Sequence, residues 1–386
     1  MNSSPTKETI RSVNVADLHF GTPKVPASLI PRNLRKYLHP RLQDGTVDFL
    51  FIPGDVYDAI LGLNATESFH AMQAVDELME LAIAHDFFIR VCDGTFKHDR
   101  GQNHCFMVRG NIPPLLGMPR VRTVDQLTVE RFEPLGVSVA YMPDDLPLEN
   151  PLEELKTQMR QLGLEQVDFL LRHGFWVHML PPDLPNPPRN TLDWEQVQPL
   201  IRGAVINGHE HQPSIHGRVV SCGSFDRQAH GEEHAKGFFV VDYDKPSGRI
   251  DYEFVKNEGV TIFATFNAMG EAWPDMSPVV DAWLARLKRQ EDQPNRPYLR
   301  VLSNDPTLRQ SLTEYLANQW PGCFVSSEDP TKRKRHTAVT GERPTPKHLP
   351  VLTPANLAGH VTMHLASMGD GLPQDDVEWV LALRNP

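Results

Sequence analysis

Residues 47–55 read Val-Asp-Phe-Leu-Phe-Ile-Pro-Gly-Asp. A continuous apolar run that is closed by Pro and Gly is typical of a buried strand that ends in a turn. The carboxylate of Asp55 is therefore expected to emerge at the carboxyl end of this strand. Asp17 and His19 stand in the same relation to the apolar run 10–16, and an extended chain points positions i and i+2 to one side.

Further metal-ligand residues follow in order along the chain. They are His98 with Asp99, then His173 after the apolar run 167–171, and finally Gly208-His209-Glu210-His211. Each piece alone is common in a chain with 17 His. The ordered set is hard to obtain by accident, because its pieces follow apolar, strand-like runs. It predicts a metal site whose ligands converge from several strand ends.

The residue types indicate which chemistry such a site performs. Two divalent ions about 3.5 to 4 Å apart can activate a water and hold the attacking and leaving oxygens of a displacement at phosphorus. One carboxylate must bridge the ions, and manganese, iron and zinc all accept a mixture of imidazole and carboxylate. Asp55 is the expected bridge. The residues therefore predict a two-metal phosphoesterase.

The ordered set resembles the pattern of the calcineurin-like metallophosphoesterases, which is Asp-x-His, Gly-Asp, Gly-Asn-His-Asp, His and Gly-His-x-His. Residues 221–227, 231–233 and 236–238 resemble the stretch that follows the last histidines in SbcD-type nuclease subunits of DNA double-strand-break repair. The resemblance covers roughly residues 10–255. It implies an α/β protein with a four-layer αββα core and a second, smaller α/β capping domain.

The resemblance also implies roles for single residues. The implied ligands are Asp17, His19, Asp55 and His211 for one ion, and Asp55, His173 and His209 for the other. His98 is expected to act at the scissile phosphate, with Asp99 orienting its ring. Two divalent ions, with manganese as the expected metal, would complete the site. Asp58 is expected to be structural or to support a ligand, and His104, His178 and His216 lack a motif frame.

The third motif departs from the family pattern. The loop reads Asp93-Gly94-Thr95-Phe96-Lys97-His98-Asp99, so Thr95 stands where the family has the Asn that binds the second ion. A hydroxyl is a weaker ligand than an amide oxygen. Thr95 itself, Asp93, a water or an altered path of the loop are the alternatives for this position.

Composition and charge set the outer limits of the interpretation. A chain of 386 residues with 40% hydrophobic and 23% charged residues can hold two ordinary globular domains. Its four Cys show no Cys-x-x-Cys spacing, and neither a run of eighteen apolar residues nor a signal peptide is present. We therefore expect a cytoplasmic protein that does not enter a membrane.

The net charge of −11 argues against a protein that coats nucleic acid by itself. It does not exclude a nuclease, because two divalent cations add positive charge where the phosphate binds. The dense basic run is Lys332, Arg333, Lys334 and Arg335. It is interpreted either as a contact to the DNA backbone or as a solvated loop.

Element patterns divide the chain into three parts. Residues 1–256 are expected to form the nuclease domain, 257–330 a capping domain for DNA recognition, and 331–386 a linker with a tail. The tail either docks on a coiled-coil ATPase of the SbcC type or packs back onto its own domain. Expected strands are 12–16, 49–52, 87–91, 137–141, 169–171, 204–206, 218–221, 237–242, 250–254 and 298–302, and expected helices are 66–85, 151–162, 278–289 and 307–316.

The function predicted from the sequence is a manganese-dependent DNA nuclease subunit, expected as a homodimer that acts in DNA repair or recombination. It would hydrolyse phosphodiesters without a covalent intermediate. Two alternatives stay open. One is a phosphoesterase for small nucleotide phosphodiesters, and the other is a scaffold of the same fold with impaired catalysis.

Overall fold

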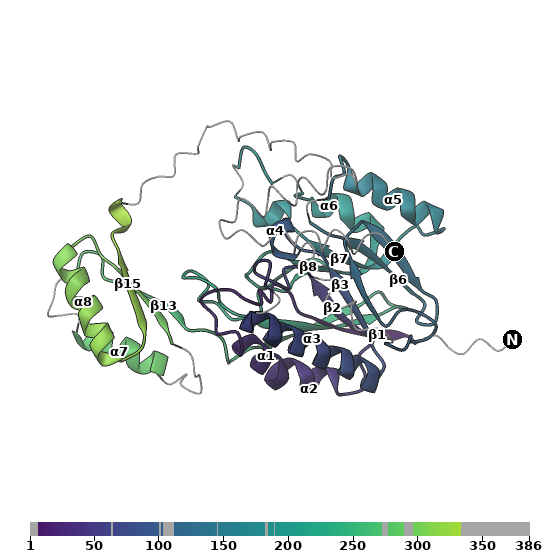
Figure 1. Cartoon of the computed structure of the whole chain (residues 1–386). Coiled ribbons are helices and arrows are strands. Elements are labelled where there is room, and N and C mark those ends of the chain that lie inside the picture. Colours follow the sequence, from purple (N-terminus) through teal and green to yellow (C-terminus); the bar gives the residue numbers. More distant parts are fainter. Residues whose placement is uncertain are drawn as a thin grey trace, which may run out of the picture. The chain divides into compact units, whose positions relative to one another are not determined.

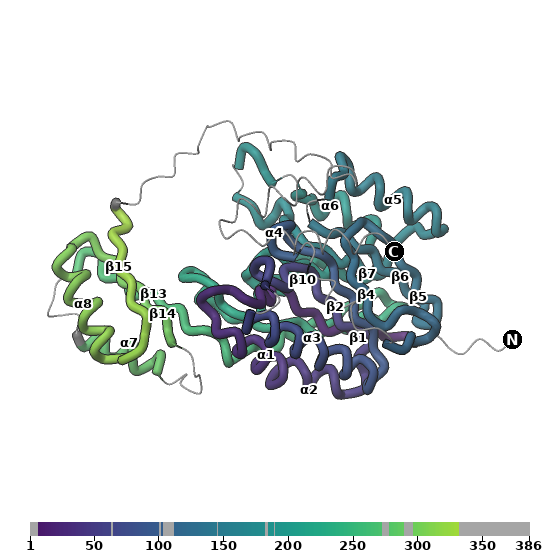
Figure 2. The backbone as a smooth tube through the Cα atoms, viewed as in Figure 1, coloured from purple at the N-terminus to yellow at the C-terminus, as the bar shows by residue number. Residues whose placement is uncertain are grey.

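The structure is a computed structural model that describes residues 7–62, 65–99, 102, 112–144, 146–181, 184–188, 190–271, 277–288 and 296–332. The described residues up to Thr331 form one compact unit. Sheets and helices alternate along it (Figures 1 and 2), and the prediction of a mixed α/β protein is confirmed.

The first sheet has six strands in the order β12-β11-β1-β2-β3-β4. Its strands are β1 (Thr9–Asn14), β2 (Phe49–Pro53), β3 (Phe88–Cys92), β4 (Val121–Val124), β11 (Gly237–Asp244) and β12 (Ile250–Lys256). Strands β1 to β4 are parallel, whereas β11 and β12 pair antiparallel. The carboxyl ends of β1, β2 and β3 therefore lie at one edge of the sheet.

The second sheet also has six strands, in the order β5-β6-β7-β8-β10-β9. They are β5 (Thr128–Phe132), β6 (Val137–Met142), β7 (Val167–His173), β8 (Ile201–Gly208), β9 (Ser214–His216) and β10 (Val219–Ser221). Strands β6, β7, β8 and β10 run parallel. The expected strands up to residue 254 all have a counterpart in these two sheets, although β1 ends at Asn14, two residues before its expected end.

The two sheets share an apolar interior that is rich in aromatic rings. Phe49 of β2 makes an edge contact with Phe132 of β5 at 4.9 Å between ring centroids, and Phe51 lies 5.6 Å from Phe169 of β7. Since successive strand residues point to opposite faces, the neighbours Leu50 and Leu170 face away from this interior. The sheets thus pack face to face.

Helices cover the outer face of each sheet (Figure 1). The helices beside the first sheet are α1 (Leu29–Asn33), α2 (His39–Leu42) and α3 (Thr66–His85), with a π-helical turn at Leu34–Leu38 between α1 and α2. Those beside the second sheet are α5 (Pro151–Gln161) and α6 (Trp194–Val197). Short 3₁₀ turns occupy Val177–Met179 and Gln198–Leu200, and α4 (Phe96–Asp99) follows β3.

A third sheet with its own apolar cluster follows residue 262. It consists of three parallel strands, β13 (Phe263–Asn267), β14 (Tyr298–Leu302) and β15 (Phe324–Glu328). Helices α7 (Ser277–Lys288) and α8 (Pro306–Gln319) contribute Leu284 and Leu312 to the cluster, and a 3₁₀ turn at Pro330–Lys332 follows β15. The expected helices and strand of this part are present. The domain boundary at residue 256 stays a prediction.

Several expectations fall outside the described residues. The described residues do not include His104, Arg333, Lys334, Arg335 or the tail after them. Lys332 is the last residue of the 3₁₀ turn that follows β15. Within the described residues, no helix is both long enough and apolar enough to cross a membrane.

Candidate metal centre

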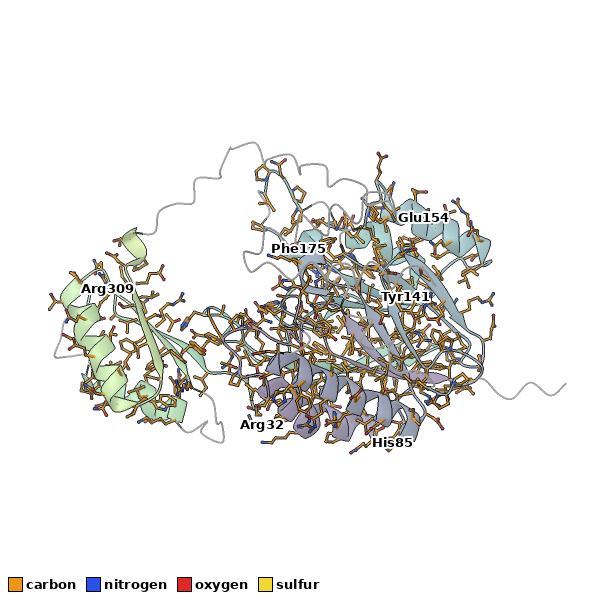
Figure 3. The ribbon with its side chains drawn as sticks, in the orientation of Figure 1. Arg32, His85, Tyr141, Glu154, Phe175 and Arg309 are labelled. Atoms are coloured by element: carbon orange, nitrogen blue, oxygen red, sulfur yellow. The ribbon has the colours of Figure 1, made fainter. Side chains whose placement is uncertain are left out.

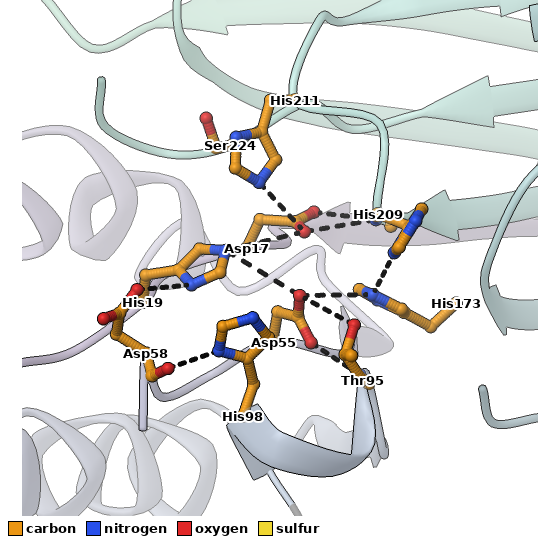
Figure 4. Close-up of polar contacts among 12 residues, drawn as sticks. Asp17, His19, Asp55, Asp58, Thr95, His98, His173, His209, His211 and Ser224 are labelled. Atoms are coloured by element: carbon orange, nitrogen blue, oxygen red, sulfur yellow. Dashed lines mark hydrogen bonds and ion pairs between the residues drawn. The ribbon is translucent and has the colours of Figure 1, made fainter. Parts of the chain in front are cut away.

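The predicted ligands meet at the carboxyl ends of four strands, two from each large sheet (Figure 4). Asp17 and His19 follow β1, Asp55 follows β2, and His173 is the last residue of β7. His209 and His211 come directly after β8. Asp17, His19, Asp55 and His173 are buried, whereas both histidines after β8 are partly exposed. His98 is partly exposed too, so solvent reaches the site beside these three histidines.

Three groups of His and Asp side chains in the described residues lie close enough to hold a metal ion. They are Asp17 with His19 and His211; His19 with Asp55 and His98; and Asp55 with His173 and His209. Within each group the potential ligand atoms all lie within 4.8 Å of one another. The first and third groups contain every ligand expected from the sequence, and Asp55 belongs to two groups.

Asp55 occupies the centre of the site. Its Oδ2 lies 3.4 Å from His173 Nε2 and 3.8 Å from His19 Nε2, which belong to different groups. Burial opposes ionisation, but the imidazoles of His173, His19 and His98 hold the pKa of the Asp55 carboxyl below its ordinary value. An ionised carboxylate between two sets of ligands has the position that a bridging ligand requires.

His173 and His209 form one side of the site. His173 donates Nδ1–H to the carbonyl oxygen of Pro53 at 2.8 Å, which leaves Nε2 to face His209 Nδ1 at 3.1 Å. The ring of Phe175, which is labelled in Figure 3, packs edge-on against His209 with centroids 4.1 Å apart. Although burial lowers it, the pKa of His173 is raised to about 10 by the carboxylates of Asp55 and Asp17. These carboxylates favour positive charge at this point.

Asp17, His19 and His211 form the other side. Asp17 Oδ1 lies 3.8 Å from His211 Nε2 and 3.9 Å from His19 Nε2. The Asp17 carboxylate also accepts the backbone N–H of His209 at 3.1 Å, which ties the loop after β8 to the loop after β1. The remaining ring nitrogen of His211 faces Glu232 at 3.1 Å.

His98 lies beside His19, with ring centroids 5.0 Å apart. Its Nδ1–H donates to the backbone carbonyl of Asp58, whose carboxylate lies 3.3 Å from His19 Nδ1. The expectation that Asp99 orients the His98 ring is wrong. The Asp99 carboxylate accepts the backbone N–H of Gly94 at 2.9 Å and of Tyr57 at 3.1 Å, because α4 turns it toward the loops rather than the ring.

Asp99 is buried and joins the loops after β2 and β3. Burial and the charge of Asp55 raise its pKa to about 7, although the two backbone donors act in the opposite direction. In the site, the Asp99 carboxylate holds the loop at Gly94 against the loop that contains Asp55 and Tyr57. The sequence did not indicate this role, because the short helix α4 was expected as an open loop.

Thr95 reaches the shared carboxylate. Its backbone N–H donates to Asp55 Oδ1 at 2.6 Å, and its hydroxyl lies 3.3 Å from Asp55 Oδ2. Gly94 makes this approach possible, since a Cβ there would overlap the Asp55 carboxylate. Thr95 thus lies at the edge of the group formed by Asp55, His173 and His209. Its hydroxyl is directed at the carboxylate of Asp55, and a contact of Thr95 with a metal ion stays a prediction.

The backbone of the site is unusual. Asp17, His19, Asp55 and His209 all have positive φ, between 46° and 86°. Such conformations cost a non-glycine residue roughly 1 to 3 kcal/mol each, and they concentrate at functional sites. The sharp left-handed turns direct these side chains from the strand ends toward one another.

The residues fit a bound metal ion. His19 is buried, and its Nε2 makes no hydrogen bond with any described residue while it faces two carboxylates. A buried polar atom without a partner is costly unless something binds it. The donors are imidazole nitrogens and carboxylate oxygens, a mixture that suits manganese, iron or zinc.

Some residues of the site were not expected to have a role in it. The sequence indicates no role for Phe175, and Glu232 and Lys236 lie in the downstream stretch that carries the resemblance. Asp58 was expected to be structural or supporting, and it touches both His19 and His98. His178 and His216 stack on each other with centroids 4.0 Å apart. Neither of them belongs to the three metal-binding groups found among the described residues.

Comparison with known proteins adds little to this picture. No protein-family model and no curated protein matches the chain. One solved structure, GAP50, the anchor in the inner membrane complex of Plasmodium, is 13% identical, with a TM-score of 0.36 over 65% of this chain and 85% of that one. A second is 12% identical, with a TM-score of 0.37 over 64% of this chain and 99% of that one. Likeness at this level carries no inference about fold or function.

Proposed function

We propose that this chain is a two-metal phosphodiesterase of the calcineurin-like type, with the four-layer αββα core of that superfamily, and that it acts as a DNA nuclease subunit of the SbcD type. The observation that carries the proposal is the position of Asp55 between two groups of potential ligands. Its Oδ2 lies 3.8 Å from His19, which belongs to the group with Asp17 and His211, and Asp55 itself belongs to the group with His173 and His209. Two face-to-face sheets with helices on their outer faces support the assignment of the core.

The proposed reaction is hydrolysis of a phosphodiester by direct attack of water. When bound, two divalent ions, with manganese as the proposed metal, supply an activated water and positive charge beside the phosphate. Asp17, His19, Asp55 and His211 would hold one ion, and Asp55, His173 and His209 the other. His98 keeps Nδ1–H on the Asp58 carbonyl, so Nε2 is the nitrogen that would stabilise the transition state or donate a proton to the leaving oxygen.

DNA is the proposed substrate because residues 221–238 resemble the stretch that follows the metal motifs in repair nucleases. The basic run 332–335 is a proposed contact to the DNA backbone. A coiled-coil ATPase of the SbcC type, a homodimer and a cytoplasmic location stay predictions that accompany this function.

The shared carboxylate gives a direct test of the proposed function. Asp55→Asn keeps the shape of the side chain but removes the charge that both groups use, so we expect hydrolysis of linear DNA in manganese to fall by at least about 100-fold. The control is Asp251→Asn on β12, an exposed carboxylate that pairs with Arg249, which should leave the rate unchanged. Melting curves establish that both variants are folded.

The same assay separates the alternatives. Wild-type rates in Asp55→Asn would contradict the proposal. Hydrolysis of a chromogenic diester without cleavage of DNA would favour a phosphoesterase for small nucleotides. A folded wild-type protein that binds one ion or none would favour the scaffold, for which the threonine at position 95 is the motivating feature.

A further inference from the structure

Glu232 lies directly behind the proposed metal ligand His211. The Glu232 Oε1 atom is 3.1 Å from His211 Nδ1, while His211 Nε2 points to Asp17 on the opposite side of the ring. A carboxylate can only accept hydrogen bonds, so Nδ1 carries the proton. The ring is thereby left with Nε2 as the nitrogen that is available to a metal.

Lys236 fixes Glu232 in this position. Its ammonium donates to Glu232 Oε2 at 2.7 Å, to Ser224 Oγ at 2.6 Å and to the backbone carbonyl of His211 at 2.9 Å. The three donors of the ammonium thus meet three acceptors. Lys236 is only 1% exposed, so this cation is committed to the contacts named here.

The Glu232–Lys236–Ser224 cluster therefore holds His211 at two points, its ring through Glu232 and its backbone through Lys236. The ring of His173 is also held through its Nδ1–H, but there the acceptor is the backbone carbonyl of Pro53. His211 differs because it is 28% exposed at the side chain and follows a strand end. Without support from behind, its ring would be free to rotate or to change tautomer.

We propose that Glu232 is a positioning residue that orients His211 for metal binding, and that Lys236 and Ser224 hold Glu232 for this purpose. This inference rests on the proposed function and names a determinant of its first metal group. Such partners of a ligating histidine commonly change metal affinity by about 10- to 100-fold when they are removed.

The chain offers a matched control in the adjacent residue. Glu233, the next residue in the sequence, carries the same side chain but is exposed. Manganese is titrated calorimetrically into the wild-type protein and into Glu232→Ala, Glu232→Gln and Glu233→Ala. We expect Glu232→Ala to weaken one of two manganese sites by 10- to 100-fold, Glu233→Ala to change neither, and Glu232→Gln to retain part of the affinity through its amide oxygen.

A second readout reports on the ring itself. In zinc-loaded protein, nitrogen NMR should show His211 protonated at Nδ1 and metal-bound at Nε2, and Glu232→Ala should disturb this signal more than that of His173. If Glu232→Ala leaves the Lys236 charge buried without its carboxylate partner and fails to fold, Glu232→Ala with Lys236→Met removes both charges, and the same loss of affinity is expected.

The outcomes for the inference and for the proposed function are distinct. Two manganese sites of wild-type affinity in folded Glu232→Ala would overturn the role of Glu232 and leave the proposed function intact. Equal losses in Glu232→Ala and Glu233→Ala would also overturn it. A wild-type protein that binds no manganese would overturn both, and this result comes from the wild-type titration alone.

Discussion

At the residue scale, the proposed ligands share an unusual backbone conformation as well as metal-binding side chains. Asp17, His19, Asp55 and His209 adopt positive φ, although glycine is the residue that favours this region. The sequence identified these residues by their types and order. It gave no sign of their conformation, because left-handed backbone at Asp or His depends on the contacts around it.

Substitutions at position 55 measure the energetic cost of this positive-φ backbone. Asp55→Gly and Asp55→Ala both remove the carboxylate, but only Gly accepts a φ of 49° without cost. We expect metal-free Asp55→Gly to be more stable than Asp55→Ala by about 1 kcal/mol in urea unfolding. At Asp251 within β12 the order should reverse, because Gly weakens a strand. The same order at both positions would contradict the account of the site.

At the element scale, apolar runs predicted most strands of the two large sheets, because buried parallel strands are continuously apolar. The sequence missed strands that are not continuously buried, namely β4, β5, β9, β13 and β15, and the short helices α1, α2, α4 and α6. Four residues carry too little periodicity to predict a helix. This omission led to the wrong role for Asp99, since α4 determines where its carboxylate points.

A row of stacked aromatic rings crosses the three strands of the third sheet, and substitution of the middle ring tests whether this stacking stabilises the sheet. Tyr298 of β14 stacks on Phe263 of β13 at 4.8 Å and on Phe324 of β15 at 4.9 Å, in the register of the strands. Tyr298→Ala removes both stacks and should lower the free energy of unfolding by about 1 to 3 kcal/mol, while Tyr298→Phe should be nearly neutral. Hydrogen exchange at β14 amides provides the measurement. Equal protection in all three proteins would show that the row of stacked rings contributes nothing.

At the scale of the whole molecule, the fold brings together residues that are up to about two hundred positions apart in the sequence. Asp17 accepts the backbone N–H of His209, and His173 donates to Pro53, so contacts between ligand loops connect the two sheets. The order of motifs predicted the ligand set. It could not predict the supporting contacts of Phe175, Glu232 and Lys236, because none of these follows from spacing along the chain.

The central claim is that two ions share Asp55, and crystals soaked in manganese test it most directly. Anomalous difference maps should show two peaks about 3.5 to 4 Å apart, one beside His19 and His211 and the other beside His173 and His209, with the Asp55 carboxylate between them. A single peak, or two peaks that do not both contact Asp55, would contradict the account.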